Sequence, residues 1–283
     1  MLGLTLALAA YGSTAAGAMA GDAAKPQRIM SLMLCNDLLL LQLAPRERIA
    51  SISFLARDAV ADLMPGADVG VAVNQGTAED ILLQQPDLIL AGTYSSTRAR
   101  HLAREAGARV LEVEAANNFE DIRRNVQQVA AAVGEPARGE ALLASMDKHL
   151  AWLAAHPPAR PPRVVAWSGG GQTPGTGTLT HAILTASGAV NVAARNEDGR
   201  YGSFGLEELL AARPDAILQG ENRWAGPSLQ DAESAHPLIA RNWQGRRISY
   251  PDAAYACGLP QSADAAVALR RLYDRLPAAA LPW

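Results

Sequence analysis

Apolar residues recur at helical spacing most regularly in residues 135–156, EPARGEALLASMDKHLAWLAAH. One face of this stretch collects Leu142, Leu143, Met146, Leu150 and Leu153. Spacings of three and four residues place side chains on one side of a helix, so the pattern predicts a helix here. Pro136 suits its first turn, and Pro157 with Pro158 ends it because neither ring can continue the hydrogen-bond ladder. About twenty residues at ~1.5 Å rise make a rod of roughly 30 Å.

The segments on either side of this predicted rod contain an internal repeat. Residues 79–92 read EDILLQQPDLILAG and residues 207–220 read EELLAARPDAILQG. Without gaps, the two copies share the leading Glu, the fourth-place Leu, a Pro-Asp step, an Ile-Leu pair and the final Gly. Each predicts a short amphipathic helix, a turn, and a buried parallel strand. We interpret the repeat as an internal duplication of one α/β lobe.

Strand and helix patterns alternate along the rest of the chain. Strands are predicted at 28–33, 48–53, 87–91, 109–113, 163–167, 190–193, 215–218 and 246–250. Helices are predicted at 38–43, from 79, and at 97–106, 119–133, 180–186, 206–212, 234–242 and 262–276. Asn36 or Asp37 is predicted to cap the helix at 38–43, and Thr77 the helix that begins near 79. This alternation predicts the α/β class: two Rossmann-like lobes with mostly parallel sheets, joined by one long connecting helix. The expected boundaries are 27–134, 135–157 for the linker helix and 161–283, and 283 residues suffice for two lobes.

Loops at the carboxyl ends of the strands are the expected ligand site, because open α/β sheets bind ligands there. We expect such loops at 54–58, 93–96, 168–178, 195–203, 220–228 and 251–260. Aromatic rings and arginines within them suit a flat or bulky, partly anionic ligand, although each is equally compatible with an ordinary surface or core role. The candidate ligand-binding residues are Arg57, Tyr94, Trp167, Arg200, Tyr201, Arg223, Trp224 and Tyr255.

Composition and motifs exclude several other functions. A net charge of −3 gives no electrostatic case for a nucleic-acid partner. The glycine-rich stretch 168–178, SGGGQTPGTGT, lacks the Gly-Lys-Ser/Thr ending of a P-loop, and we expect a loose, ligand-facing loop. No Cys-His cluster has zinc spacing, and neither a Ser-His-Asp nor a Cys-His constellation can be argued. We therefore expect a protein that is not an enzyme and holds no cofactor or metal ion of its own.

The first twenty residues form a separate segment. An apolar run at 2–10 is followed by small residues and an Ala18-Met19-Ala20 step, which is an A-x-A type cleavage site before Gly21. We predict a secretory signal peptide at 1–20 and a periplasmic mature protein. No Lys or Arg precedes the apolar run, and an N-terminal core helix is the alternative. The run is shorter than the ~20 residues that a membrane span needs.

The repeat and the rod together resemble the class III periplasmic substrate-binding proteins, which serve ABC importers for ferric siderophores, haem and cobalamin. The resemblance covers residues 28–276 and implies a permease with its ATPase as partner. In that family an acidic residue on each lobe docks onto permease arginines, a role that carries over to Glu79 and Glu207. Asp80 and Glu208 are neighbours that could share it. A favourable helix-dipole charge is the alternative role for both leading glutamates.

The resemblance leaves the ligand open. Arginines near the expected cleft favour an anionic ferric siderophore, and Trp and Tyr side chains suit cobalamin almost as well. Haem or a metal ion bound by a protein of the same type is a further alternative, as is a two-lobed α/β enzyme. We expect a monomer that captures a metal chelate between its lobes.

The chain has two cysteines, Cys35 after the first strand and Cys257 after the last. Both would lie at strand carboxyl ends. A cysteine pair in an exported protein is more often bonded than free. We hypothesise a Cys35–Cys257 disulfide that crosses the lobes and limits their opening.

Overall fold

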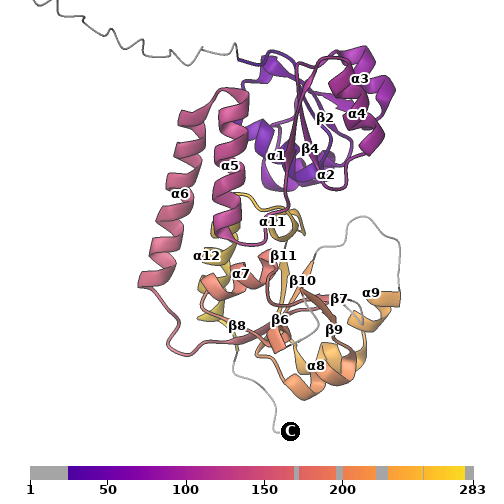
Figure 1. Cartoon of the computed structure of the whole chain (residues 1–283). Coiled ribbons are helices and arrows are strands. Elements are labelled where there is room, and N and C mark those ends of the chain that lie inside the picture. The colour runs from indigo at the N-terminus through magenta and orange to yellow at the C-terminus, as the bar shows by residue number, and fades with distance from the viewer. Residues whose placement is uncertain (1–24, 169–171, 196–199, 221–228, 251, 278–283) are drawn as a thin grey trace, which may run out of the picture.

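The chain folds into two α/β lobes connected by the long helix α6 (Pro136–Ala155), as the computed structural model in Figure 1 shows. The structure describes residues 25–168, 172–195, 200–220, 229–250 and 252–277. The predicted fold class is confirmed. Within the described residues, no helix combines the length and the apolarity needed to cross a bilayer.

The N-terminal lobe is built on a parallel sheet with strand order β3-β2-β1-β4-β5. Its strands are β1 (Ile29–Ser31), β2 (Ile49–Ser53), β3 (Ala72–Asn74), β4 (Leu88–Gly92) and β5 (Arg109–Val113). Helices α1 (Leu34–Leu43), α2 (Ala56–Leu63), α3 (Ala78–Gln84), α4 (Thr97–Glu105) and α5 (Phe119–Val133) alternate with them. Every residue of β4 is buried, as expected of a central parallel strand that helices cover on both faces.

The C-terminal lobe repeats this plan with a parallel sheet ordered β11-β10-β6-β8. Its strands are β6 (Arg163–Ala166), β8 (Val190–Asn191), β10 (Ala216–Gly220) and β11 (Arg247–Tyr250). A separate antiparallel ribbon pairs β7 (Gln172–Pro174) with β9 (Tyr201–Ser203). The helices are α7 (Leu179–Ala186), α8 (Leu206–Ala212), α9 (Leu229–Ser234), α10 (Pro237–Asn242), α11 (Asp252–Ala256) and α12 (Ser262–Tyr273).

The duplicated segments adopt the same backbone conformation in both lobes. Helices α3 and α8 end at Gln85 and Arg213, which are left-handed with φ of 45° and 46°. The Asp of each Pro-Asp step then accepts hydrogen bonds from the backbone at the start of a neighbouring strand. Asp87 accepts from Arg28 N at 3.0 Å, and Asp215 accepts from Arg163 N at 2.8 Å. The shared Asp therefore ties β4 to β1 and β10 to β6, which explains its presence in both copies.

Helix α6 packs along α5 and α12 and thereby contacts both lobes (Figure 1). Leu143, Met146 and Leu153 are buried on its predicted apolar face, and Leu142 and Leu150 are half-buried beside them. Packing of this face, rather than intrinsic helix propensity, is what stabilises such a helix in a folded protein.

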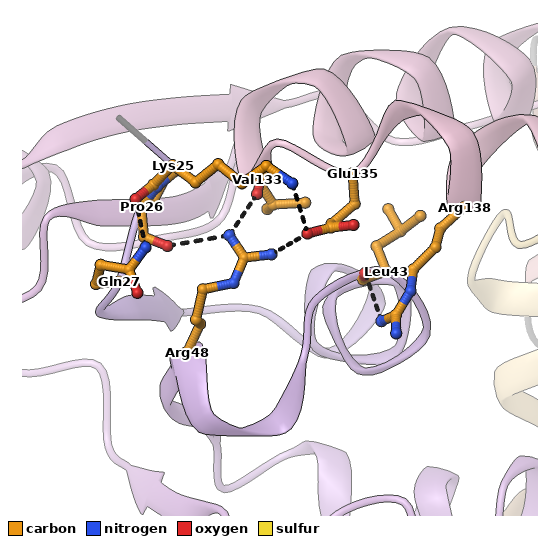
Figure 2. A network of polar contacts seen from close by, with 8 residues as sticks. All are labelled: Lys25, Pro26, Gln27, Leu43, Arg48, Val133, Glu135 and Arg138. Carbon is orange, nitrogen blue, oxygen red and sulfur yellow. Dashed lines mark hydrogen bonds and ion pairs between the residues drawn. The ribbon is translucent and has the colours of Figure 1, made fainter. Parts of the chain in front are cut away.

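The N-terminal end of α6 is fastened to its lobe by Arg48, which Figure 2 shows at the centre of a polar network. Its guanidinium donates to Val133 O at 2.9 Å and to Pro26 O at 3.2 Å, and it forms an ion pair with Glu135. Lys25 reaches the same Glu135 carboxylate at 3.3 Å. Arg48 and its hydrogen bond to Val133 O are buried, so this carbonyl has little alternative solvation.

Replacing Arg48 with methionine is expected to lower the free energy of unfolding by about 2–3 kcal/mol, because it leaves the Val133 and Pro26 carbonyls without the guanidinium donor that they share. Urea unfolding of the purified chain measures this change. Arg98→Met, at an exposed position on α4, is the matched control and should change stability by less than about 0.5 kcal/mol. Equal stability of the two variants would contradict the anchoring role.

Several local predictions are wrong, and the side-chain contacts explain why. Helix α1 begins at Leu34, and Asn36 and Asp37 do not cap it, because Asn36 donates to Ala91 O and Asp37 accepts from Ser53 N. Four predicted loops contain regular structure: 54–58 opens α2, 251–260 contains α11, 168–178 contributes β7, and 195–203 contributes β9. The predicted helix 234–242 is divided between α9 and α10, since His236 caps a new helix before Pro237. Thr77, by contrast, caps α3 as predicted.

Candidate functional site

The carboxyl ends of the two sheets face each other, and two contacts between the lobes fix this arrangement. Cys35, in the first turn after β1, forms a disulfide with Cys257, which follows β11 and α11, and their Cα atoms are 5.0 Å apart. Arg200, next to β9, donates from Nη1 to Asn117 Oδ1 at 3.2 Å, beyond the end of β5. The structure thus contains the hypothesised disulfide. We call the region between the two sets of strand ends the interlobe cleft.

The cysteine contact is part of a wider junction between the lobes. Gly258 lies so close to the N-terminal lobe that a Cβ there would stand 2.3 Å from the Ala116 Cβ atom. Gln261 donates a hydrogen bond to Gln42 on α1. The segment after α11 is therefore fitted closely against the N-terminal lobe.

The N-terminal lobe presents large apolar and aromatic side chains at this edge. Phe54 and Leu55 follow β2 and are 46% and 39% exposed. Tyr94 is 89% exposed at the tip of a turn after β4, which Ser95 closes by bonding back to Gly92 through both its N–H and its hydroxyl. Arg57 is exposed in the first turn of α2. Such side chains at strand ends are available to a ligand rather than to the core.

The C-terminal lobe contributes Arg200 and Tyr201, at the start of β9. Both are exposed, Tyr201 to 56%. Arg200 also lines a polar hollow of about 580 Å³ against β5 and α5, whose walls include Glu112, Glu114 and Asp121. Although partial burial raises the pKa of Asp121, hydrogen bonds from Asn117 N and Arg124 lower it below its ordinary value, so the Asp121 carboxylate stays charged.

Two predicted ligand residues lie in the core instead. Trp167 is 1% exposed, and its indole nitrogen donates to Phe204 O at 2.7 Å. Tyr255 is 6% exposed and packs on Tyr250 with ring centroids 4.0 Å apart. Trp167 directly follows β6 and still turns into the hydrophobic layer, whereas Tyr255 lies within α11, which packs against the core. Arg223 and Trp224 lie outside the described residues.

Phe54, Leu55 and Asn117 are candidate residues that the sequence prediction did not select. Phe54 and Leu55 are adjacent apolar residues directly after a strand, where both cannot point into one core face. That adjacency was the available signal. No such signal marked Asn117, because its partner across the lobes, Arg200, is 83 residues away in sequence.

Asp37 is fully buried beneath the N-terminal strand ends. Its carboxylate accepts hydrogen bonds from the backbone N–H and the hydroxyl of Ser53. Burial raises the pKa of Asp37 to about 7, and hydrogen bonds from Ser31 and Ser53 offset only part of that effect. The folded protein therefore binds a proton here at pH values where the unfolded chain has lost it.

This raised pKa predicts a pH-dependent effect of Asp37→Asn. The contribution of protonated Asp37 is fully present below the unfolded pKa near 4 and is lost as pH rises through 7. The wild type should therefore lose about 2–3 kcal/mol of unfolding free energy between pH 5 and pH 7.5 that the variant does not lose. The variant's free energy of unfolding minus that of the wild type rises by the same amount. Urea titrations of both proteins across this range measure the difference. A difference that stays constant with pH would contradict the assignment.

Glu79 and Glu207 occupy equivalent exposed positions, the second residues of α3 and α8. Their neighbours are engaged in capping: Asp80 accepts from Thr77 N at 3.2 Å, and Glu208 accepts from Gly205 N at 2.7 Å. Neither leading glutamate has a hydrogen bond or ion pair within the part of the chain that the structure describes. Each of the two duplicated helices therefore presents one carboxylate that is not used in capping. Across the described residues, no group of three or more His, Cys, Asp or Glu side chains is placed to hold a metal ion.

Comparison with known proteins places this architecture in a family. The model of a periplasmic binding protein family matches residues 29–241, from the first strand to the end region of α10. The chain belongs to the periplasmic binding protein family. Its members are binding proteins rather than enzymes, and membership implies a periplasmic location. The predicted family and the non-enzymatic class are confirmed.

Proteins similar to this periplasmic binding protein are named as cobalamin-, vitamin B12- or heme-binding proteins. Cobalamin-binding proteins from two strains of Halobacterium salinarum are 25% identical over 228 residues, which cover 77% of this chain. The match spans 60% of the length of those relatives. The heme-binding protein HutB of Vibrio cholerae superposes with a TM-score of 0.72 at 18% identity, covering 87% of this chain and 98% of HutB. The vitamin B12 binding protein BtuF of Vibrio cholerae superposes with a TM-score of 0.66 at 17% identity, covering 89% of this chain and 98% of BtuF. These structural likenesses show the fold.

Proposed function

We propose that this protein is the solute-binding component of an ABC importer and captures a metal chelate in the interlobe cleft for delivery to the permease and its ATPase. The observation that carries the proposal is the set of exposed apolar and aromatic side chains at facing strand ends. Phe54, Leu55 and Tyr94 come from one lobe and Tyr201 from the other. A wide, flat ligand can be covered from both sides by such a surface.

The ligand we propose is a corrin or related tetrapyrrole, with cobalamin first. The aromatic and apolar rim supports this class, and so does the 25% identity to cobalamin-binding relatives. Arg200 hydrogen-bonds Asn117 and is less available to an anionic siderophore than the sequence suggested. Haem remains a candidate because Tyr94 presents a solvent-exposed phenol, and tyrosine is one of the side chains that ligate haem iron. A ferric siderophore is the remaining candidate.

Removing two of the exposed rings is expected to weaken chelate binding without affecting the fold. Phe54→Ala/Tyr94→Ala should lower cobalamin affinity by at least about tenfold, since aromatic anchors dominate such contacts. Quenching of intrinsic fluorescence on titration with cobalamin measures this. Val69→Ala removes another exposed apolar side chain, before β3 and at the opposite end of the sheet, and should leave the affinity unchanged. Unaltered binding by the double variant would place the ligand elsewhere.

The remaining features of the proposal concern processing and organisation. We propose that residues 1–20 are a signal peptide, and that 27–134, 135–157 and 161–283 form the N-terminal lobe, linker helix and C-terminal lobe. The mature chain would act as a monomer. Glu79 and Glu207 would dock onto permease arginines, and their exposed, uncommitted carboxylates support that role.

A further inference from the structure

An exposed pair of leucines distinguishes α3 from its duplicate α8. Leu82 and Leu83 on α3 are 56% and 83% exposed. The aligned positions of α8 are Leu210, which is half-buried, and Ala211. The two copies therefore share a leading carboxylate and differ in the apolar surface beside it.

The leucines and the carboxylate of α3 lie on one face. Leu82 and Leu83 are three and four residues after Glu79, the spacing that places helical side chains next to one another. We call this face, Glu79 with Leu82 and Leu83, the α3 pad. A single exposed leucine needs no explanation, but adjacent apolar side chains with a charged rim are typical of a protein contact.

A recess adjoins the α3 pad and adds shape to it. It encloses about 240 Å³ where α3 ends and β5 begins, and Leu82 forms one wall. The other walls are mainly apolar and comprise Ile81, Gln85, Pro86, Ala106 and Ala108. A partner's apolar side chain could enter this recess and bury the exposed leucine surface at the same time, which is favourable in proportion to the area removed from water.

We propose that the α3 pad is a docking surface for the importer permease that is specific to the N-terminal lobe. This inference rests on the proposed function. A permease residue of positive charge pairs with Glu79 while a neighbouring apolar side chain covers Leu82 and Leu83 and fills the recess. A second copy of this chain is a poorer occupant, because two such pads would bring their carboxylates together. The C-terminal lobe offers Glu207 beside Ala211 and the half-buried Leu210, so it presents less apolar surface than the α3 pad. The two docking contacts therefore differ, which would fix the orientation of the protein on the permease.

The test is binding of the purified full chain to its permease–ATPase complex in lipid nanodiscs. Leu82→Ala/Leu83→Ala, which removes the apolar surface of the α3 pad, should weaken this binding at least about tenfold and leave cobalamin affinity unchanged. Leu238→Ala, which removes a 42% exposed leucine from α10, is the control and should bind like the wild type. Sedimentation velocity should give the same monomer for all three proteins.

The outcomes separate this inference from the proposed function. If the wild type binds the complex and the double variant binds it equally well, the α3 pad alone is overturned. Failure of the wild type to bind the complex would overturn the proposed function and the pad with it. A wild-type dimer that the double variant abolishes would show that a second copy, and not the permease, occupies the pad.

Discussion

Glu79→Ala/Glu207→Ala is expected to abolish chelate uptake while leaving chelate binding unchanged. Both carboxylates are exposed at equivalent positions of the duplicated helices, and neither interacts with the rest of the described chain. Removing them should therefore cost the fold little, whereas a basic partner would lose both of its orienting charges. Uptake by cells that carry the importer and depend on the chelate, together with fluorescence titration of the purified variant, measures the two properties separately.

Glu47→Ala/Glu140→Ala is the matched control for this variant. It removes the same two charges from exposed positions outside α3 and α8 and should leave uptake near the wild-type level. Equal loss of uptake in both double variants would indicate a general charge effect. Loss of chelate binding in Glu79→Ala/Glu207→Ala would contradict the docking role.

Removing the disulfide should have the largest effect on stability. The bond joins residues 222 apart in sequence and closes most of the described chain into one loop. In the chain-entropy model, such a bond stabilises by about 3–5 kcal/mol. Cys35→Ala/Cys257→Ala should therefore lower the Tm by roughly 10 °C, measured by thermal unfolding at fixed protein concentration.

Reduction supplies an independent control for the disulfide. Dithiothreitol should lower the Tm of the wild type toward that of the double variant and leave the variant unchanged. Two free thiols in the native protein, or equal Tm values for oxidised and reduced wild type, would contradict the bond. Because Cys257 is fully buried, alanine is preferred to serine, which would bury an additional hydroxyl.

Much of the fold could be predicted from the sequence because its signals are local and repeated. The Pro-Asp steps at 86–87 and 214–215 specify a turn and a strand tie in both lobes, and apolar periodicity marks α5 and α6. Helices α2 and α11 were missed because they are short and follow a strand directly. The capping role of Asn36 or Asp37 was wrong because tertiary contacts with β4 and β2 take up those side chains.

The candidate site was less predictable, since position along the chain does not set the direction of a side chain. Trp167 and Tyr94 both follow a strand, yet Trp167 turns into the core and Tyr94 points to solvent. The pairing of Arg200 with Asn117 depends on how the two lobes meet, which no local pattern encodes. The cysteine pairing could be inferred because the chain offers only one possible pair.

Titration of the purified chain with cobalamin, haemin and a panel of ferric siderophores tests the central claim most directly. Intrinsic fluorescence reports binding, and chromatography of the recovered chelate reports any chemical change. The account predicts saturable one-to-one binding of one chelate, cobalamin first, with the chelate recovered unaltered. Binding of none of these chelates, or conversion of a bound chelate into a product, would contradict the account of this protein as a chelate carrier.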